Sequence, residues 1–223
     1  VLPYHIYKDV NQTLGFDLFF VDIPGVLDRK GIYLDPDSGY GYWDEFERFS
    51  SFQIAAVDWL NSWYVRPDVV HCHDHHTSLI PFLMKHAYTY QNMRNIPTVL
   101  TIHNGQYHGN YDTRRAFVIP TIDSLQTGLL QWEGRMNQLA CGIKCAWNVT
   151  TVSHTYLNEL SHQANGIEPL IQAEWSKMSG ILNGIDTEVW NPMSDPMLVK
   201  NYGVKDFVQG KKANKKYLTN RFG

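Results

Sequence analysis

The chain has 223 residues, of which 43% are hydrophobic and 18% are charged, and its formal net charge is −3 at pH 7. This composition excludes a disordered protein, and the lack of a basic excess argues against a nucleic-acid-binding protein. The sequence holds no apolar run of membrane-spanning length, so we expect no membrane partner. The sparse, odd set of cysteines (Cys72, Cys141 and Cys145) suits a reducing compartment, and we expect a cytoplasmic protein.

Short apolar segments alternate with helical patterns along the chain. Each segment is bounded by turn or polar residues, as buried parallel strands are, and the expected strands are residues 16–21, 68–73, 97–103, 149–152 and 178–182. The helical patterns cover residues 45–63, 77–90, 133–146, 153–160 and 212–221. Residues 25–44 and 105–131 are predicted to be long, loop-rich insertions.

This alternation predicts an α/β fold with a Rossmann-like, doubly wound parallel sheet. Ligands bind to such sheets at the carboxyl ends of the strands. Polar pairs fall at three predicted strand ends, namely His73–Asp74, His103–Asn104 and Asn183–Gly184. We therefore expect a ligand site along this edge of the sheet.

The densest cluster of chemically active side chains is residues 71–76, with the sequence His-Cys-His-Asp-His-His. These are zinc-ligand types, so a zinc metallo-hydrolase is one hypothesis, although the cluster misses the His-x-His-x-Asp-His spacing of metallo-β-lactamase-like hydrolases by one residue. In a strand, His71 and His73 share one face and Cys72 lies on the other. Two alternatives remain: histidines that are hydrogen-bonded within the core and sheet edge, or a substrate-facing Asp74 with structural histidines around it.

Markers of other enzyme classes are missing from the sequence. It contains no Gly-x-Ser-x-Gly elbow, no phosphate-binding lysine loop and no complete Gly-x-Gly-x-x-Gly after a strand. Aromatic residues make up 13% of the chain, which suits sugar binding and ordinary core packing equally well. A non-catalytic carbohydrate-binding module therefore stays open as a further alternative.

Several motifs occur together in the order that one family shows. They are residues 19–22 with 28–33, 47–49, 71–77, 101–109, 150–156, 179–192 and 210–215. On these motifs the chain resembles the N-terminal domain of bacterial glycogen synthase and plant starch synthase, which are retaining glucosyltransferases of the GT-B fold (family GT5). The resemblance runs over nearly the whole chain.

The resemblance implies transfer of glucose from ADP-glucose, or from UDP-glucose, to the non-reducing end of an α-1,4-glucan in glycogen or starch biosynthesis. It implies retention of configuration, and neither a metal nor another cofactor. His103 and Asp74 are the implied catalytic residues. His103 would lie beside the donor glucose, where its main chain stabilises positive charge at the anomeric carbon, and Asp74 would lie near the reacting sugars.

The resemblance also implies four substrate-binding residues. Asn183 would hydrogen-bond the donor. Asn104 and Tyr107 would hold the turn that carries His103, and Tyr42 would line the cleft.

By the same resemblance, residues 1–223 form the N-terminal, acceptor-side half of a two-domain GT-B fold, truncated at both ends and lacking its first strand and helix. Residues 209–223 are expected to begin the connection to a C-terminal nucleotide-binding domain that this sequence does not contain. The expected partners are a sugar nucleotide, a glucan and that second domain. We therefore expect the isolated chain to be inactive.

Overall fold

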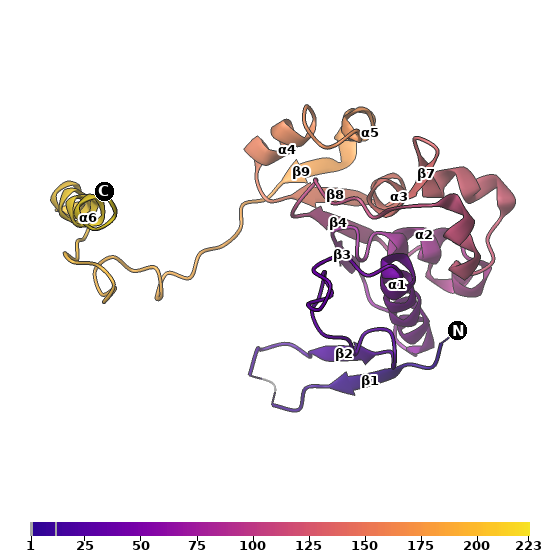
Figure 1. Ribbon diagram of the computed structural model, residues 1–223. Coiled ribbons are helices and arrows are strands. Elements are labelled where there is room, and N and C mark those ends of the chain that lie inside the picture. Colours follow the sequence, from indigo (N-terminus) through magenta and orange to yellow (C-terminus); the bar gives the residue numbers. More distant parts are fainter. Residues whose placement is uncertain (1, 12) are drawn as a thin grey trace. The chain divides into compact units, whose positions relative to one another are not determined.

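The computed structural model describes residues 2–11 and 13–223, which form two compact units, Val1–Leu182 and Asn183–Gly223 (Figure 1). The first unit is built on a four-stranded parallel sheet with the order β3-β4-β8-β9, whose strands are Val70–His73, Thr98–Ile102, Asn148–Thr151 and Met178–Gly180. Four of the five predicted strands, those within residues 68–73, 97–103, 149–152 and 178–182, are thereby confirmed. The predicted α/β class with a parallel sheet is confirmed as well.

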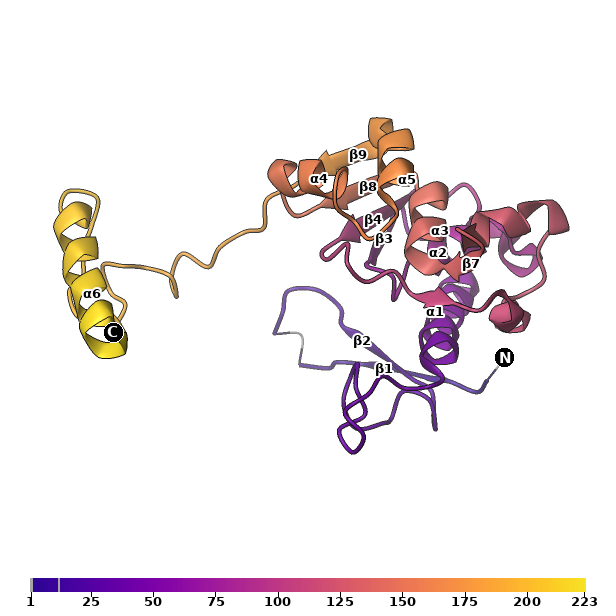
Figure 2. The ribbon, with the colours of Figure 1, turned by 45° about the horizontal axis from the view of Figure 1, so that its top comes forward.

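Three helices cover the sheet on one side. These are α1 (Glu45–Ser62), α2 (Leu79–His86) and α3 (Gln138–Cys145), and α2 packs against both α1 and α3 (Figures 1 and 2). Gly142 allows α3 to approach the start of α2 closely, because a Cβ atom at this position would lie 2.6 Å from the Cβ atom of Ser78. The fully buried core side chains include Phe46, Phe82, Leu83, Leu100, Leu139 and Ile143.

Two further helices connect β8 to β9 along the chain. α4 (His154–Leu160) packs against both strands, and the side chain of Ser153 caps it by accepting a hydrogen bond from the backbone N–H of Tyr156 at 2.9 Å. α5 (Glu168–Ala173) and the 3-10 turn η4 (Trp175–Lys177) complete this crossover. The sequence patterns did not predict these last two elements.

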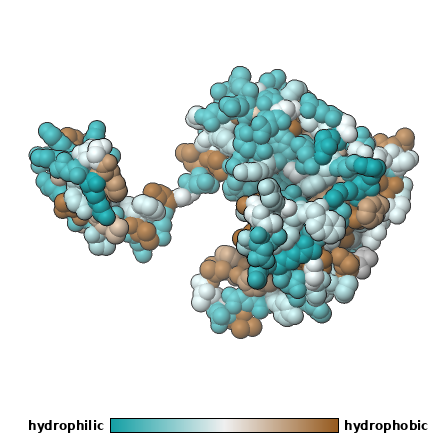
Figure 3. All heavy atoms as spheres, in the orientation of Figure 1, coloured by the Kyte–Doolittle hydropathy of each residue, from teal (hydrophilic) through white to brown (hydrophobic). Residues whose placement is uncertain are grey.

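The prediction that residues 16–21 form a strand of the parallel sheet is wrong. β2 (Phe19–Asp22) pairs instead with β1 (His5–Lys8) in a separate antiparallel hairpin. Only one face of this hairpin is covered, since the ring of Phe19 lies 4.7 Å from that of Trp59 on α1 while Phe20 is 55% exposed. Hydrophobic residues accordingly reach the surface around the hairpin in Figure 3.

The prediction that a helix begins at residue 133 is also wrong. Residues 133 and 134 form a tight turn with φ values of 48° and 76°, conformations that a helix cannot contain. The turn joins β6 (Gln131–Trp132) to β7 (Arg135–Asn137), which also pairs with β5 (Asn110–Tyr111). α3 begins only after Asn137, whose side chain accepts a hydrogen bond from the backbone N–H of Ala140 at 2.8 Å.

The remaining differences concern helix ends and short turns. The helix predicted over residues 77–90 ends at His86, and a 3-10 segment follows it. The 3-10 segments of the first unit before β6 are η1 (Tyr88–Met93), η2 (Thr113–Val118) and η3 (Ser124–Leu130). The last two occupy the predicted insertion 105–131.

The second unit consists of an irregular segment and α6 (Phe207–Phe222), which begins earlier than the predicted residue 212. α6 packs closely against the irregular segment at Gly210, where a Cβ atom would lie 2.3 Å from the Cβ atom of Tyr202. The side chain of Asn214 also donates a hydrogen bond to the backbone oxygen of Lys200 at 2.7 Å. Across the residues that the structure describes, no helix combines the length and apolar character needed to cross a membrane.

Candidate functional site

Asp74 lies directly after β3 in a left-handed backbone conformation, with φ of 53°. Aspartate tolerates this region better than most residues do. The backbone N–H of Asp74 donates to Thr101 on β4 at 2.9 Å, and its Oδ1 atom accepts hydrogen bonds from the backbone N–H groups of His103 at 2.8 Å and Asn104 at 3.3 Å. One carboxylate therefore ties together the ends of two neighbouring strands, as the predicted strand-end site requires.

His73 and His103 form the second contact between these strand ends. Nδ1 of His73 lies 3.0 Å from Nε2 of His103, and the two rings stack with their centroids 5.2 Å apart. Partial burial lowers the pKa of His73, and the neighbouring His71 and His103 lower it further. A hydrogen bond between two imidazoles needs one donor and one acceptor, so at least one of the two rings is neutral.

The loop after His103 is held from three sides. The side chain of Asn104 accepts a hydrogen bond from the backbone N–H of Gln106 at 3.0 Å, and the N–H of Gly105 donates to the hydroxyl of Tyr156 on α4 at 3.0 Å. The backbone oxygen of His108 accepts from the N–H of Leu139 on α3 at 3.0 Å. Tyr107 is 64% exposed on this fixed loop, so its ring is free to meet a ligand.

A cavity of about 530 Å³, the main cavity, opens beside Asp74. Its lining residues are Tyr33, Leu34, Gly41, Glu45, Asp74, His75, His76, Asn104 and Tyr107. One wall is thus the carboxyl edge of β3 and β4, and the other is the loop between β2 and α1. Sequence reasoning had placed Asp74, Asn104 and Tyr107 at the site, and the structure brings these three together.

The loop wall of the main cavity is fixed by two arginines. Arg48 is almost fully buried and donates hydrogen bonds to the backbone oxygens of Val26 at 3.2 Å and Ile32 at 3.3 Å. Arg29 binds both carboxylate oxygens of Asp44, at 2.7 and 2.6 Å. The hydrogen bonds from Arg29 hold the pKa of Asp44 below its usual range.

Tyr42 belongs to the same loop, but its contacts are internal. Its hydroxyl donates to the backbone oxygen of Lys30, and the guanidinium of Arg48 lies 4.3 Å from its ring centroid. The main cavity is lined by its neighbour Gly41. The structure thus shows Tyr42 supporting the cavity wall, and its predicted role in lining the cleft stays a prediction.

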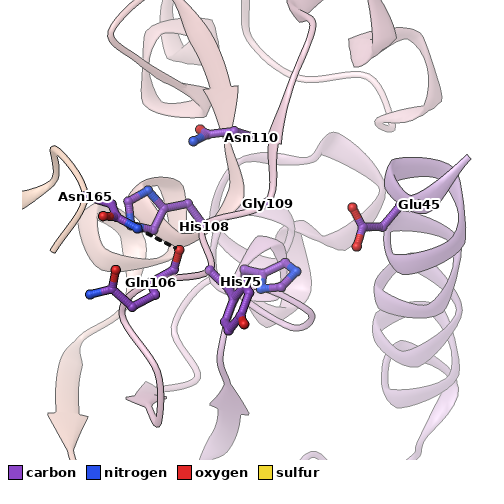
Figure 4. A pocket seen from close by; sticks show the side chains of 8 residues that line it. Glu45, His75, Gln106, His108, Gly109, Asn110 and Asn165 are labelled. Atoms are coloured by element: carbon purple, nitrogen blue, oxygen red, sulfur yellow. Dashed lines mark hydrogen bonds between the residues drawn. The ribbon is translucent and has the colours of Figure 1, made fainter. Parts of the chain in front are cut away.

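A smaller cavity of about 220 Å³, the side cavity, lies next to the loop that follows His103. Figure 4 shows the side chains around it, which come from α1, from the end of β3, from the loop 106–110 and from the segment before α5. Glu45, His75 and Tyr107 line both cavities.

The histidines of residues 71–76 have separate surroundings. Nε2 of His71 lies 2.7 Å from the hydroxyl of Thr101, while Cys72 is buried on the opposite side of the strand. His75 and His76 both pack edge-on against the ring of Phe49. In the part of the chain that the structure describes, no three His, Cys, Asp or Glu side chains converge as a metal site requires. This arrangement favours a substrate-facing Asp74 among structural histidines over a zinc centre.

Comparison with known proteins assigns the chain to a family. A family model described as "Starch synthase catalytic domain" matches residues 2–173, a range that contains Asp74, His103 and both cavities. The chain belongs to this family. It is 44% identical over 220 residues to a glycogen synthase from Flavobacterium johnsoniae, and the match covers 99% of this chain and 45% of that protein. A glycogen synthase from Streptococcus equi subsp. equi is 37% identical over 223 residues, with 98% of this chain and 45% of that protein covered.

A solved structure agrees with the starch synthase family in fold. It is the catalytic domain of Starch Synthase IV from Arabidopsis thaliana bound to ADP and acarbose, and it matches with a TM-score of 0.65 and 29% sequence identity. The match covers 94% of this chain and 43% of that chain. The predicted resemblance to glycogen and starch synthases is thereby confirmed, and the chain spans less than half the length of the relatives it matches.

Sequence reasoning missed several residues of the candidate site. Tyr33, Leu34 and Glu45 line the main cavity. None of them lies at the carboxyl end of a predicted strand, so the strand-end rule does not point to them. Tyr33 belongs to the motif at residues 28–33 that carries the resemblance, whereas Leu34 and Glu45 were visible only as residues of the insertion 25–44 and of the first turn of the next helix. Asn183, which was predicted to bind the donor, belongs to the second unit, and its role stays a prediction.

Proposed function

We propose that this chain forms the acceptor-side half of the active site of a glycogen or starch synthase. The complete enzyme would transfer glucose from ADP-glucose, or from UDP-glucose, to the non-reducing end of an α-1,4-glucan, with retention of configuration and without a metal or other cofactor. The observation that carries the proposal is the hydrogen bond from the backbone N–H of His103 to Asp74, which fixes a strand-end turn beside the main cavity in a chain of this family.

The local geometry supports the roles assigned to His103 and Asp74. Positive charge develops at the anomeric carbon when the donor's glycosidic bond breaks, and a preorganised dipole stabilises that charge without having to reorient. The turn at His103 is preorganised because Asp74 and Asn104 hold its backbone. Backbone carbonyls in such a turn offer the partial negative charge that the reaction needs, and this is the part we assign to the main chain of His103.

The nucleotide side of the reaction is assigned to residues outside this chain. The Arabidopsis relative is described as bound to ADP and acarbose, and the chain matches only 43% of it. We propose that residues 209–223 begin the connection to a nucleotide-binding domain and that Asn183 hydrogen-bonds the donor. The isolated chain is then inactive. We place the enzyme in the cytoplasm, where its three buried cysteines would stay reduced.

The test uses the full-length protein that contains this chain, with ¹⁴C-labelled ADP-glucose or UDP-glucose and glycogen as acceptor. We expect incorporation of label into α-1,4-linked glucose, with ADP-glucose the better donor, and no incorporation by the 223-residue chain alone. Replacement of His103 by Ala keeps the backbone carbonyl but removes the ring that stacks on His73 and supports the turn. We expect kcat to fall about 10²-fold, because small displacements in a reacting site cost that much. No transfer from either donor, or undiminished transfer by the His103→Ala variant, would contradict the proposal.

A further inference from the structure

His108 is a buried histidine on the loop that follows His103. Only 5% of the residue is exposed, and its side chain lies among those that border the side cavity in Figure 4. Its Nε2 atom lies 2.9 Å from the backbone oxygen of Gly105. A carbonyl oxygen only accepts hydrogen bonds, so Nε2 carries a proton and donates to Gly105. The side chain of His108 thus closes the loop back onto its own backbone, close to His103 in the sequence.

The surroundings of the second ring nitrogen select the same tautomer. Nδ1 of His108 lies 3.5 Å from the amide nitrogen of Asn137, at the long end of hydrogen-bond distances. That amide is oriented, because its oxygen accepts a hydrogen bond from the backbone N–H of Ala140 in the first turn of α3. Asn137 therefore turns an N–H group toward Nδ1, which is a bare acceptor. The two partners fit a neutral ring with its proton on Nε2, and they join the loop to the start of α3.

The carbonyl of Gly105 depends on the bond from His108. Gly105 is buried, and among the described residues Nε2 of His108 is the one hydrogen-bond donor to its oxygen. The N–H group of Gly105 donates to the hydroxyl of Tyr156 on α4 at 3.0 Å. A buried carbonyl without a donor is costly. A loop that lost the donor of His108 would therefore shift to hydrate this oxygen, and the main chain at His103 would shift with it.

We propose that His108 is a positioning residue for glucosyl transfer, with its Nε2–H group holding the Gly105 carbonyl and thereby fixing the main chain at His103. This role rests on the proposed function, in which the main chain of His103 stabilises charge at the anomeric carbon. Asp74 holds that main chain from β3, through the backbone N–H of His103. His108 holds it from the far end of the turn, so the turn is fixed at both ends.

The experiment compares two amide variants of the full-length enzyme that differ by one methylene group. In His108→Gln the side-chain nitrogen extends about as far as Nε2 does and can donate to the Gly105 carbonyl. In His108→Asn the nitrogen ends near the position of Nδ1 and cannot reach that carbonyl. Both variants place an uncharged amide in the same buried position, so burial of the amide affects them alike. The control is His154→Asn, because His154 is exposed at the start of α4 and lines neither cavity.

We expect His108→Asn to lower kcat at least about 10-fold, because small displacements in a reacting site are costly, and to change the KM for glucan and donor by less than about 3-fold. His108→Gln keeps the hydrogen bond, so its kcat should stay within about 3-fold of the parent value. The control should leave kcat unchanged. A merely structural residue would lower stability and leave kcat per folded molecule unchanged. That result, or equal kcat values for the Gln and Asn variants, would overturn the role of His108.

A second measurement does not depend on activity. The ring nitrogens of His108 are identified by ¹⁵N NMR at neutral pH as the signals that disappear in His108→Gln, and we expect the proton on Nε2 alone. A proton on Nδ1 would overturn the inference. If His108→Asn does not fold, as judged by circular dichroism, the tautomer and the kcat of His108→Gln decide. A parent enzyme that transfers no glucose would contradict the proposed function instead, and the tautomer would still report on the contact with Gly105.

Discussion

Asp74 and His103 are joined by a hydrogen bond of 2.8 Å between a side-chain carboxylate and a backbone N–H, across two parallel strands. The contact does not involve the His103 side chain, so it fixes where the main chain of the turn lies whatever the state of the imidazole. A substitution at Asp74 can therefore displace the turn while the His103 side chain is unchanged. Such a variant distinguishes the effect of the turn's position from the effect of the imidazole ring.

Replacement of Asp74 tests this relationship. Asp74→Gly accepts the left-handed backbone, with φ of 53°, but removes the oxygen that binds the turn. We expect kcat of the full-length enzyme to fall about 10²-fold, because small displacements in a reacting site cost that much. Asp74→Asn keeps an acceptor oxygen at the same place and should retain more activity. Equal activity of the glycine variant and the parent would show that the bond does not position the turn.

Gly105 leaves no room for a side chain next to α4. A Cβ atom at this position would lie 2.3 Å from Cδ2 of the buried Leu160. Gly105→Ala should therefore destabilise the fold by about 1–3 kcal/mol, the usual effect of overpacking, as measured by urea denaturation. In a double-mutant cycle with Leu160→Ala, the two changes should be less costly together than their sum. Strict additivity would place the clash elsewhere.

We expect Arg48 to contribute both to the stability of the fold and to binding of the glucan acceptor. It is buried and holds the backbone at Val26 and Ile32, so that the loop wall carrying Tyr33 stays in place. Arg48→Lys keeps the charge but has fewer donors and no planar group to lie over the Tyr42 ring. We expect a loss of about 1–3 kcal/mol in the free energy of unfolding and a higher KM for glucan, with the KM for the donor unchanged. The control is Arg94→Lys, whose site lies outside both cavities, and an equal change there would contradict the assignment.

His75 should make the free energy of unfolding depend on pH. Burial lowers its pKa to about 3 in the folded chain, against an ordinary value of 6.5. Between these values the unfolded chain binds a proton that the folded chain does not, so stability falls as pH falls, by up to about 1.4 kcal/mol per pH unit. Above the ordinary value this contribution vanishes. Denaturation at pH 7 and pH 5 should show a smaller pH dependence for His75→Phe than for the parent, and equal slopes would contradict the buried, neutral ring.

The sequence predicted the parallel sheet well because its strands are buried on a helix-covered face and read as compact apolar runs. β3, β4, β8 and β9 fall within, or within one residue of, the predicted segments. The hairpin strand at Phe19–Asp22 has the same composition but only one covered face, and a run of apolar residues does not reveal what lies across it. The helical pattern over residues 133–146 does not reveal the turn at Glu133–Gly134, because that turn is set by the positive φ values of these two residues.

The candidate site was predictable only where a strand ends. The strand-end rule brought Asp74 and Asn104 to one edge, and the structure places them there. It could not find Tyr33, which reaches the main cavity from a loop whose course depends on buried contacts of Arg48, or Glu45, which reaches it from the start of α1. Nor could it find that Nδ1 of His75 is buried without a hydrogen-bond partner among the described residues, since that property depends on every neighbour of the ring rather than on the sequence around it.

The three cysteines lie on two elements of one core, Cys72 in β3 and Cys141 with Cys145 in α3, and all three are buried. Burial raises the pKa of Cys72 to about 12, so at neutral pH almost none of it is the thiolate that alkylating reagents attack. Because all three sulfurs are buried, a reagent reaches them only when the strand or the helix comes away from the core. Their rates of alkylation would time the opening of sheet and helix separately, in the natural chain and without any introduced label.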